Sequence, residues 1–265
     1  PGSDTYDSID VSNFGFYRDK NLINYEEYCY YIKTIGHYSL PGLVDPLINY
    51  SQLKCETPID NIPPCKPELS VYTDCEQVTN ELAMYLPYDS CSYDAVKYYI
   101  YYTPPGGDIT ELVDSIDYVH NDTTYFLHEN IEYIVGCYYI TAKDSVGNIS
   151  EPSNVYCVDY DECPVYELPN VFTPNGDDKN PLFVPMGSNS GNPKANVSKV
   201  NMTIMNRWGK TMYTTTDPTI NWDGKNQNNN QDCVNGVYYY VCDVYIVTLK
   251  GEVMITMQGS VTIIR

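Results

Sequence analysis

The spacing of four cysteines around two predicted turns constrains the fold of this chain more than any other feature. The segment Cys-Tyr-Tyr-Ile occurs twice, beginning at Cys29 and again at Cys137. Cys137 and Cys157 are equidistant from Gly147, and Cys29 and Cys55 are likewise equidistant from a Pro-Gly pair. Residues equidistant from the turn of an antiparallel hairpin face each other within reach of a disulfide. The sequence therefore predicts two β-hairpins, closed by the bonds Cys29–Cys55 and Cys137–Cys157.

The other six cysteines are expected to complete a disulfide framework. Ten cysteines, an even number, are typical of a protein in an oxidising compartment such as the periplasm or the cell surface. The sequence contains no C-x-x-C motif and no histidine at ligand spacing, which argues against a zinc site. The expected strand order suggests the pairs Cys65–Cys91 and Cys75–Cys163, and Cys233–Cys242 is then left by elimination.

Short segments rich in Tyr, Val and Ile fill the middle of the chain. Turn sequences such as Pro-Pro-Gly-Gly at 104–107 separate these segments, which are predicted as strands. Several short strands within about 100 residues, without a helical period, indicate a β-sandwich. The predicted strands cover residues 68–73, 81–86, 96–102, 123–127, 133–142 and 154–158.

The net charge of −20 belongs to the first part of the chain. Residues 1–163 carry 7 Lys and Arg against 27 Asp and Glu, whereas residues 164–265 carry 8 of each. An acidic surface repels phosphates, which argues against nucleic acid as a partner. It also keeps an extended extracellular protein soluble. We interpret the first part as an acidic, tyrosine-rich stalk and the last part as an electrically neutral end domain.

The last hundred residues also alternate in the way that β-strands do. Apolar and polar residues alternate from Val200 to Ile204, so one face of this strand is apolar. The segment 237–247 is predicted to pair with 252–264 across a tight turn. The expected architecture is a seven-strand sandwich that closes on its own C-terminal strand. If that strand lies at a sheet edge, it could be offered to a partner by β-augmentation.

Five short motifs follow one another in this last region. They are L-P-N-V-F-T-P-N-G-D from Leu168, N-R-W-G from Asn206, W-D-G-K from Trp222, G-V-Y-Y-Y from Gly236 and G-S-V-T-I-I-R ending at Arg265. In this order they resemble the gliding-motility-associated C-terminal domain, the type B sorting domain of the type IX secretion system of Bacteroidota. The resemblance covers about residues 166–265. It implies a domain that carries a large surface protein across the outer membrane, and it implies no catalysis.

The middle of the chain resembles a fibronectin type III domain, of the kind that often precedes this sorting domain. The resemblance rests on the tyrosine-rich strand at 98–102, the Cys-Tyr-Tyr-Ile strand and the Asp-Ser-Val-Gly-Asn turn after it. The usual Trp of the second strand is absent, and Met84 or Tyr85 is expected in its place.

The predicted fold class is therefore all-β, with tandem fibronectin type III-like sandwiches followed by an Ig-like β-sandwich. The expected domains are the C-terminal part of one fibronectin-like domain at 1–63, a complete one at 64–163 and the sorting domain at 164–265. Because the first copy lacks its early strands, we expect the chain to be the C-terminal part of a longer protein.

The resemblance also implies a partner and a location. It implies recognition at the outer membrane by the type IX machinery, with a barrel of the PorP/SprF-like type as partner, and exposure on the cell surface. A Trp in a sandwich is more often core, which is the expectation for Trp222, while the turn position of Trp208 leaves it open between core and binding anchor. The candidate recognition residues are Arg207, Trp208, Gly209, Trp222, Asp223, Gly224, Val261, Ile263 and Arg265.

A cluster of side-chain oxygens after Pro174 is a weak candidate for calcium. Asn175, Asp177 and Asn180 offer the ligand type that Ca²⁺ prefers, but no Glu follows at the twelfth position as in an EF-hand. A turn rich in Asx residues explains the cluster without a metal. The family pattern usually has Gly where this chain has Asp178, which puts the usual loop conformation in doubt.

Taken together, these patterns predict the C-terminal secretion and surface-attachment module of a large cell-surface adhesin. No G-x-S-x-G or H-E-x-x-H motif occurs, so no enzyme activity and no cofactor are expected. No apolar run approaches the ~20 residues that a transmembrane helix needs. Two alternatives stay open. The chain could bind carbohydrate or calcium directly as an adhesive module, or it could be the non-catalytic tail of a secreted enzyme.

Overall fold

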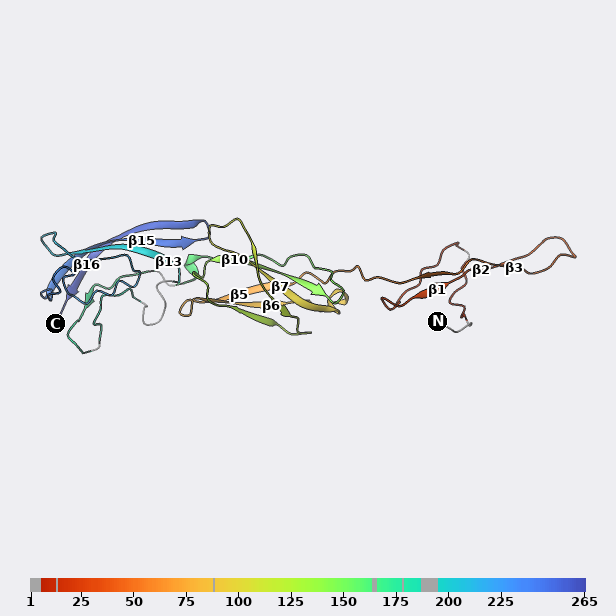
Figure 1. Ribbon diagram of the computed structural model, residues 1–265, viewed down its shortest axis with the longest axis horizontal. Coiled ribbons are helices and arrows are strands. Elements are labelled where there is room, and N and C mark those ends of the chain that lie inside the picture. The colour runs from red at the N-terminus through yellow and green to blue at the C-terminus, as the bar shows by residue number, and fades with distance from the viewer. Residues whose placement is uncertain (1–5, 13, 88, 164–165, 178, 187–194) are drawn as a thin grey trace. The chain divides into compact units, whose positions relative to one another are not determined.

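The computed structural model is all-β, which confirms the predicted fold class. The structure describes residues 6–12, 14–87, 89–163, 166–177, 179–186 and 195–265. The chain forms two compact units, Pro1–Ile62 and Pro63–Arg265 (Figure 1). The second unit contains both of the regions that were expected as separate domains at 64–163 and 164–265.

The first unit consists of two short antiparallel ladders without a hydrophobic core. β1 pairs with β4 and β2 pairs with β3, and Cys29 lies directly opposite Cys55 in a disulfide. None of the described residues in this unit is buried, and Ile32 is 65% exposed. Backbone hydrogen bonds, one disulfide and surface side-chain contacts, such as Ser51 Oγ accepting from the Ile32 N–H at 2.8 Å, therefore hold these strands. The strands are β1 (Tyr28–Tyr30), β2 (Lys33–Gly36), β3 (Leu47–Tyr50) and β4 (Lys54–Glu56).

The second unit begins with a seven-strand sandwich. One sheet has the order β5-β6-β9 and the other β11-β10-β7-β8. Inward-facing residues of both sheets form one buried cluster, in which Met84 is fully buried whereas Tyr85 is 40% exposed, so Met84 takes the central place. The strands are β5 (Glu68–Asp74), β6 (Thr79–Tyr85), β7 (Ala95–Thr103), β8 (Glu111–Asp117), β9 (Thr124–His128), β10 (Gly136–Asp144) and β11 (Tyr156–Val158).

Three disulfides tie this sandwich together. The bond Cys137–Cys157 joins residues that face each other on β10 and β11. The other two close the ends of the sandwich: Cys65–Cys91 near its start and Cys75–Cys163 near its exit. These pairs, like Cys29–Cys55, are the ones that the mirror positions and the strand order predict.

The end of the chain forms one five-stranded sheet in the order β12-β16-β15-β13-β14. β12 runs parallel to β16, and all the other pairs are antiparallel. The long β15–β16 hairpin, coloured blue in Figure 1, is the centre of this sheet. The strands are β12 (Val171–Phe172), β13 (Val197–Met205), β14 (Thr211–Thr215), β15 (Gly236–Thr248) and β16 (Gly251–Ile263).

The opposite layer of this end domain differs from the expected seven-strand sandwich. Among the described residues, loops with isolated bridges between Phe183 and Trp222 and between Lys225 and Asp232 cover the sheet. The physical reason lies in the composition of these loops. Their Asn and Asp side chains accept hydrogen bonds from the backbone N–H groups of nearby residues, as Asp217 and Asp223 do, and this favours turns over ladders.

The tip of the β15–β16 hairpin packs against the sandwich. The Leu249 carbonyl accepts a hydrogen bond from Gly106 at 3.1 Å, and its N–H donates to Asp159 at 3.2 Å. Ala195 and Val247 of the end domain are buried in the sandwich's own apolar cluster. The end domain therefore shares part of its core with the preceding sandwich.

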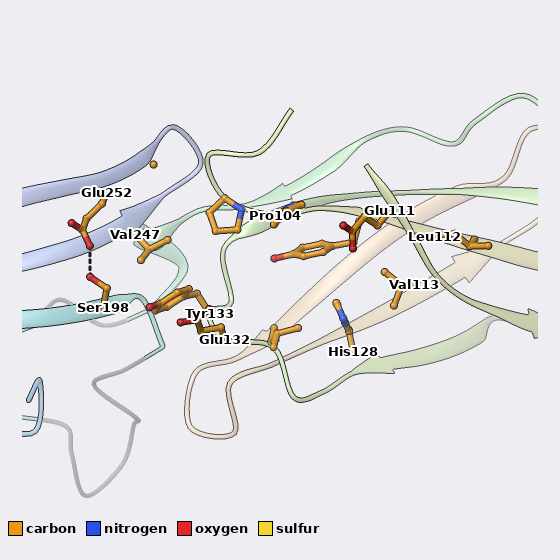
Figure 2. A pocket seen from close by; sticks show the side chains of 14 residues that line it. Pro104, Glu111, Leu112, Val113, His128, Glu132, Tyr133, Ser198, Val247 and Glu252 are labelled. Atoms are coloured by element: carbon orange, nitrogen blue, oxygen red, sulfur yellow. Dashed lines mark hydrogen bonds between the residues drawn. The ribbon is translucent and has the colours of Figure 1, made fainter. Parts of the chain in front are cut away.

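A cavity of about 730 Å³ lies beside this joint. Figure 2 shows that both parts line it: Glu132 and Tyr133 come from the sandwich, and Ser198 and Glu252 from the end domain. His128 also lines the cavity, but its Nδ1 is paired with the Tyr138 hydroxyl at 2.9 Å. The cavity is thus a consequence of how the two parts pack at the joint.

Candidate recognition site at the end of the final sheet

The five sequence motifs meet at one end of the five-stranded sheet. β13 ends at Met205, and β15 begins at Gly236 opposite Ile263, the last residue of β16. β12 ends beside the same residue, because Phe172 pairs with Ile263. The N-R-W-G turn, the loop after β12 and the C-terminus therefore lie at the same end of the domain, which is marked C in Figure 1.

An aromatic cluster fills the interior below this end. Trp222 is fully buried, and its ring centroid lies 5.3 Å from that of Phe172 and 5.5 Å from that of Tyr238. The indole N–H donates to the Lys225 carbonyl at 2.8 Å, so its polar atom is satisfied inside the core. Trp222 is therefore a core residue, as expected for a Trp of a sandwich, and it is not available to a partner.

The apolar residues of the last strand belong to the same interior. Val261 is 0% exposed and Ile263 is 1% exposed, opposite Tyr238 and Gly236 of β15. Side chains buried in the isolated domain cannot contact a partner directly. These two candidates can act on recognition only by holding the end of the sheet in place.

The Arg265 side chain links the last strand to two loops at this end of the sheet. Its guanidinium donates from Nη2 to the Gly224 carbonyl at 3.0 Å and from Nη1 to the Cys233 carbonyl, and it lies 3.5 Å from the Asp232 carboxylate. The Arg265 side chain is 23% exposed. Arg265 therefore ties the last strand to the W-D-G-K loop.

Gly224 is required by this contact. Its φ is +76°, and a Cβ at this position would lie 3.0 Å from Arg265 Nη2 and 3.3 Å from the Phe172 ring. A side chain would therefore be strained and would push the guanidinium away. Asp223 caps the same turn by accepting from the Lys225 N–H at 3.0 Å.

Trp208 differs from Trp222, because its side chain is on the surface. It is 75% exposed, and the Arg207 guanidinium lies 4.5 Å from its ring centroid in a cation–π arrangement. The turn beneath it is well fixed. Asn206 Oδ1 accepts from the N–H groups of Trp208 and Lys210, each at 3.0 Å.

The role of Asn206 was missed by the sequence interpretation. Gly209 has a φ of +77°, and its N–H donates to the Asn206 carbonyl at 2.9 Å. Asn at the first position and Gly at the fourth position of a turn is the signal that could have identified it. The motif thus presents a large amphipathic side chain on a rigid support.

The expected bond between Cys233 and Cys242 does not form, and both residues are free and buried. Cys233 packs against the Tyr238 hydroxyl. Tyr238 and Cys242 are four residues apart on β15, which is about 13 Å along a strand. A disulfide needs Cα atoms within about 7 Å. Burial also raises the pKa of the Cys242 thiol to about 12, so it stays protonated and unreactive.

The calcium candidate is a hydrogen-bonded Asx turn. Asn175 donates from Nδ2 to Asp177 Oδ2 at 2.9 Å, and Asp177 Oδ1 accepts from the Lys179 N–H at 3.0 Å. The Asn175 amide holds the pKa of the Asp177 carboxyl below its usual value. The Asn180 carbonyl accepts from the Thr173 N–H. These bonds explain the cluster without a metal. Asp178 lies outside the described residues.

Comparison with known proteins assigns the end domain. Residues 166–263 match the model of a family described as CHU_C Type IX secretion signal domain. The last part of this chain is therefore a type IX secretion signal domain, which confirms the resemblance drawn from the five motifs. No curated protein sequence matches the chain.

Solved structures of multidomain β-proteins show only distant similarity. Domains d3–d4 of the rat CD45 extracellular region are 16% identical at a TM-score of 0.31, covering 60% of this chain and 77% of theirs. The FN1–FN3 domains of chicken CNTN1 are 12% identical at a TM-score of 0.28, covering 91% and 79%. With TM-scores this low, the fold class rests on strand order and burial instead.

An export signal agrees with the chemistry of the chain. Four disulfides suit an extracellular protein rather than a reducing compartment. None of the described segments forms a helix with the length and apolarity needed to cross a membrane.

Proposed function

We propose that this chain is the surface-attachment end of a large Bacteroidota cell-surface adhesin, and that the N-R-W-G turn is where the type IX machinery recognises it. The observation that carries this proposal is the contrast between the two tryptophans. Trp222 is fully buried, whereas Trp208 is 75% exposed on a turn with fixed geometry. A rigid, exposed Trp paired with Arg is the residue type that most often anchors a protein interface. The activity proposed is recognition, without catalysis.

The proposed partner is an outer-membrane barrel of the PorP/SprF-like type. Such a partner would contact the end of the sheet where Arg207 and Trp208 are exposed. Arg265 would stabilise this end by binding the last strand to the W-D-G-K loop. The acidic first part would remain a spacer, because its charge and its lack of a matching motif give it no recognition role. Gliding motility is a proposed use of such an adhesin.

The test replaces Trp208 in the full chain fused to a soluble reporter in a type IX-competent bacterium. Trp208→Ala should reduce the fraction of reporter on the cell surface by about tenfold or more, as expected for an interface anchor. Surface labelling of intact cells measures that fraction. Folding should be unchanged, since exposed substitutions usually stay within about 0.5 kcal/mol.

The matched control is Tyr72→Ala, because Tyr72 is an aromatic residue that is 62% exposed on the sandwich. This variant should be delivered like the wild type. Normal delivery of Trp208→Ala would remove the turn from the recognition site. A glycan array provides the alternative outcome: sugar binding that is lost in Trp208→Ala would instead favour a direct adhesive module.

A further inference from the structure

The edge of the final sheet formed by β16 is open over most of its length. β12 pairs only with Thr262 and Ile263, and among the described residues no strand lies beside the rest of that edge. Thr262 donates its N–H to Asn170, and Ile264 donates its N–H to Phe172. Even-numbered residues of β16 therefore direct their backbone groups toward this side.

The same parity continues down the strand. The odd-numbered residues of β16 exchange hydrogen bonds with β15, in a register that runs without interruption from Gly251 to Ile263. Five consecutive even-numbered residues are consequently left with outward N–H and C=O groups that no described strand pairs. They are Glu252, Met254, Thr256, Gln258 and Ser260.

Two other sheet edges in the second unit, those of β14 and β5, are covered by side chains. On β14, the Gln227 amide accepts from the Thr214 N–H at 3.0 Å and donates to the Thr214 carbonyl at 3.2 Å. On β5, the Asn154 amide does the same for Leu69, at 2.9 and 2.8 Å. Both side chains imitate the strand that is missing there. The edge strand β8 instead carries three carboxylates in seven residues, which repel an incoming strand.

Among the described residues, no side chain covers the open edge in this way. On one face of the sheet its side chains are apolar, with Val253 and Ile255 each 48% exposed, whereas on the other face Met254, 53% exposed, lies among polar residues. Only Glu252 carries a charge between Gly251 and Ser260. A long edge strand with one charged residue and unpaired backbone groups is a template for another strand.

We propose that this edge pairs with the same edge of a second copy of the chain, so that two end domains share one continuous antiparallel sheet. A two-fold axis at Thr256 brings like edges together, as in most homodimers. It sets Ile255 opposite Met257 of the second copy on one face, and Met254 opposite Gln258 on the other. The apolar side chains of the first face are thereby covered, while polar side chains meet on the second.

Charge is compatible with this arrangement. Glu252 falls opposite Ser260 of the second copy, so the two Glu252 carboxylates are about 27 Å apart along the strands. That distance exceeds the Debye length of about 8 Å at physiological salt. Residues 164–265 are neutral, with 8 basic and 8 acidic residues, whereas 1–163 are strongly acidic. Repulsion between the acidic parts opposes pairing, so added salt strengthens it.

The pairing is expected to be weak and dependent on concentration. One strip of nine residues per copy buries less surface than the ~800 Å² per partner of a standard stable interface. Sedimentation velocity over a concentration series, in 0.15 M and 0.5 M salt, should show a monomer–dimer equilibrium that shifts toward dimer at high salt. A monomer at every concentration and both salts would overturn the proposal.

A proline substitution tests whether the outward backbone N–H groups of β16 take part in the dimer. Met254→Pro removes an outward N–H that no strand among the described residues pairs, and proline is tolerated at such edge positions. It should raise the dissociation constant by about tenfold or more. Met254→Thr keeps the N–H and should change the dissociation constant much less. Equal dissociation constants for Met254→Pro and wild type would contradict edge pairing.

Amide exchange of the wild-type chain gives a second measurement that needs no variant. At low concentration the amides of Met254, Thr256 and Gln258 should exchange fast, while Ile255 and Met257 stay protected. At high concentration the even-numbered amides should become protected as well. Dimers without this change would place the interface elsewhere and refute the proposal. Trp208→Ala should leave the dimer intact, so this test is independent of the recognition turn.

Discussion

The two Cys-Tyr-Tyr-Ile strands have the same disulfide and very different surroundings. In both, the cysteines face each other across an antiparallel pair. In the second copy, β10 also pairs with β7, and Tyr138 and Ile140 are fully buried. In the first copy, β1 pairs only with β4 among the described strands, and Ile32 is 65% exposed.

This difference shows which properties of a hairpin are local. The pairing and the disulfide arise within the segment itself, because the paired strands lie close together in the sequence. Burial follows from other strands, which are distant in the sequence. The first unit therefore depends on its covalent bond, whereas the sandwich depends on packing and uses its bonds as reinforcement.

Removing the disulfide of either Cys-Tyr-Tyr-Ile hairpin should give the largest difference between the two regions, measured as amide protection. In Cys29→Ser with Cys55→Ser, we expect β1 and β4 to lose all amide protection, because a three-residue ladder without a core cannot persist. In Cys137→Ser with Cys157→Ser, the sandwich should lose about 2–5 kcal/mol and keep its protected strands. Hydrogen exchange of both regions checks this, and protected amides in β1 after the first change would mean that its strands have another source of stability.

The equivalent isoleucines sharpen the same comparison without touching a disulfide. Ile140→Ala removes a fully buried side chain, so it should cost about 2–5 kcal/mol of unfolding free energy. Ile32→Ala alters a mostly exposed side chain and should stay within about 0.5 kcal/mol. Denaturant melts of the two variants provide the measurement. Similar costs at both positions would contradict the absence of a core in the first unit.

The smallest expected effect is the pH dependence that His128 gives to the stability of the sandwich. Burial lowers the pKa of His128 below its usual 6.5. Above that value both states carry a neutral ring. Below it, the unfolded chain takes up a proton that the folded ring resists, so stability falls as the pH drops through 6.5 toward the folded pKa. The second unit should therefore melt at a lower temperature at pH 5.5 than at pH 7.5.

A variant isolates this contribution from that of the carboxylates nearby. Glu111 and Glu132 line the same cavity as His128 and are present in both proteins. In His128→Phe, the fall in melting temperature between pH 7.5 and 5.5 should be smaller by about 2 °C. An identical pH dependence in variant and wild type would show that the ring becomes protonated in the folded state as easily as in the unfolded one.

Much of the fold could be predicted from the sequence, and the exceptions have physical causes. The mirror positions identified both hairpins, and apolar alternation identified most strands. β8 was missed because Glu111, Asp114 and Asp117 interrupt its apolar pattern. The second layer of the end domain was expected as a sheet, but its Asn and Asp side chains hold loops there. Local polar bonding overcame the general expectation for a sandwich.

The candidate site was identified as a set of motifs, but not as an arrangement. The sequence favoured Trp222 as a core residue and left Trp208 open because it lies in a turn, but it did not show that only Trp208 is on the surface. The expected pair Cys233–Cys242 was wrong because elimination assumes that every cysteine has a partner, whereas both are separate core residues here.

The bond between Cys75 and Cys163 determines how the sandwich responds to a mechanical pull. These cysteines are 88 residues apart in the sequence. Tension that enters from Pro63 reaches Cys75, crosses the sulfur bridge to Cys163 and continues toward the end domain. The segment between Cys75 and Cys163 carries no load, so about 300 Å of extendable backbone is removed from the force path. Under tension the sandwich behaves as a short inextensible link, and the end domain takes up the lengthening.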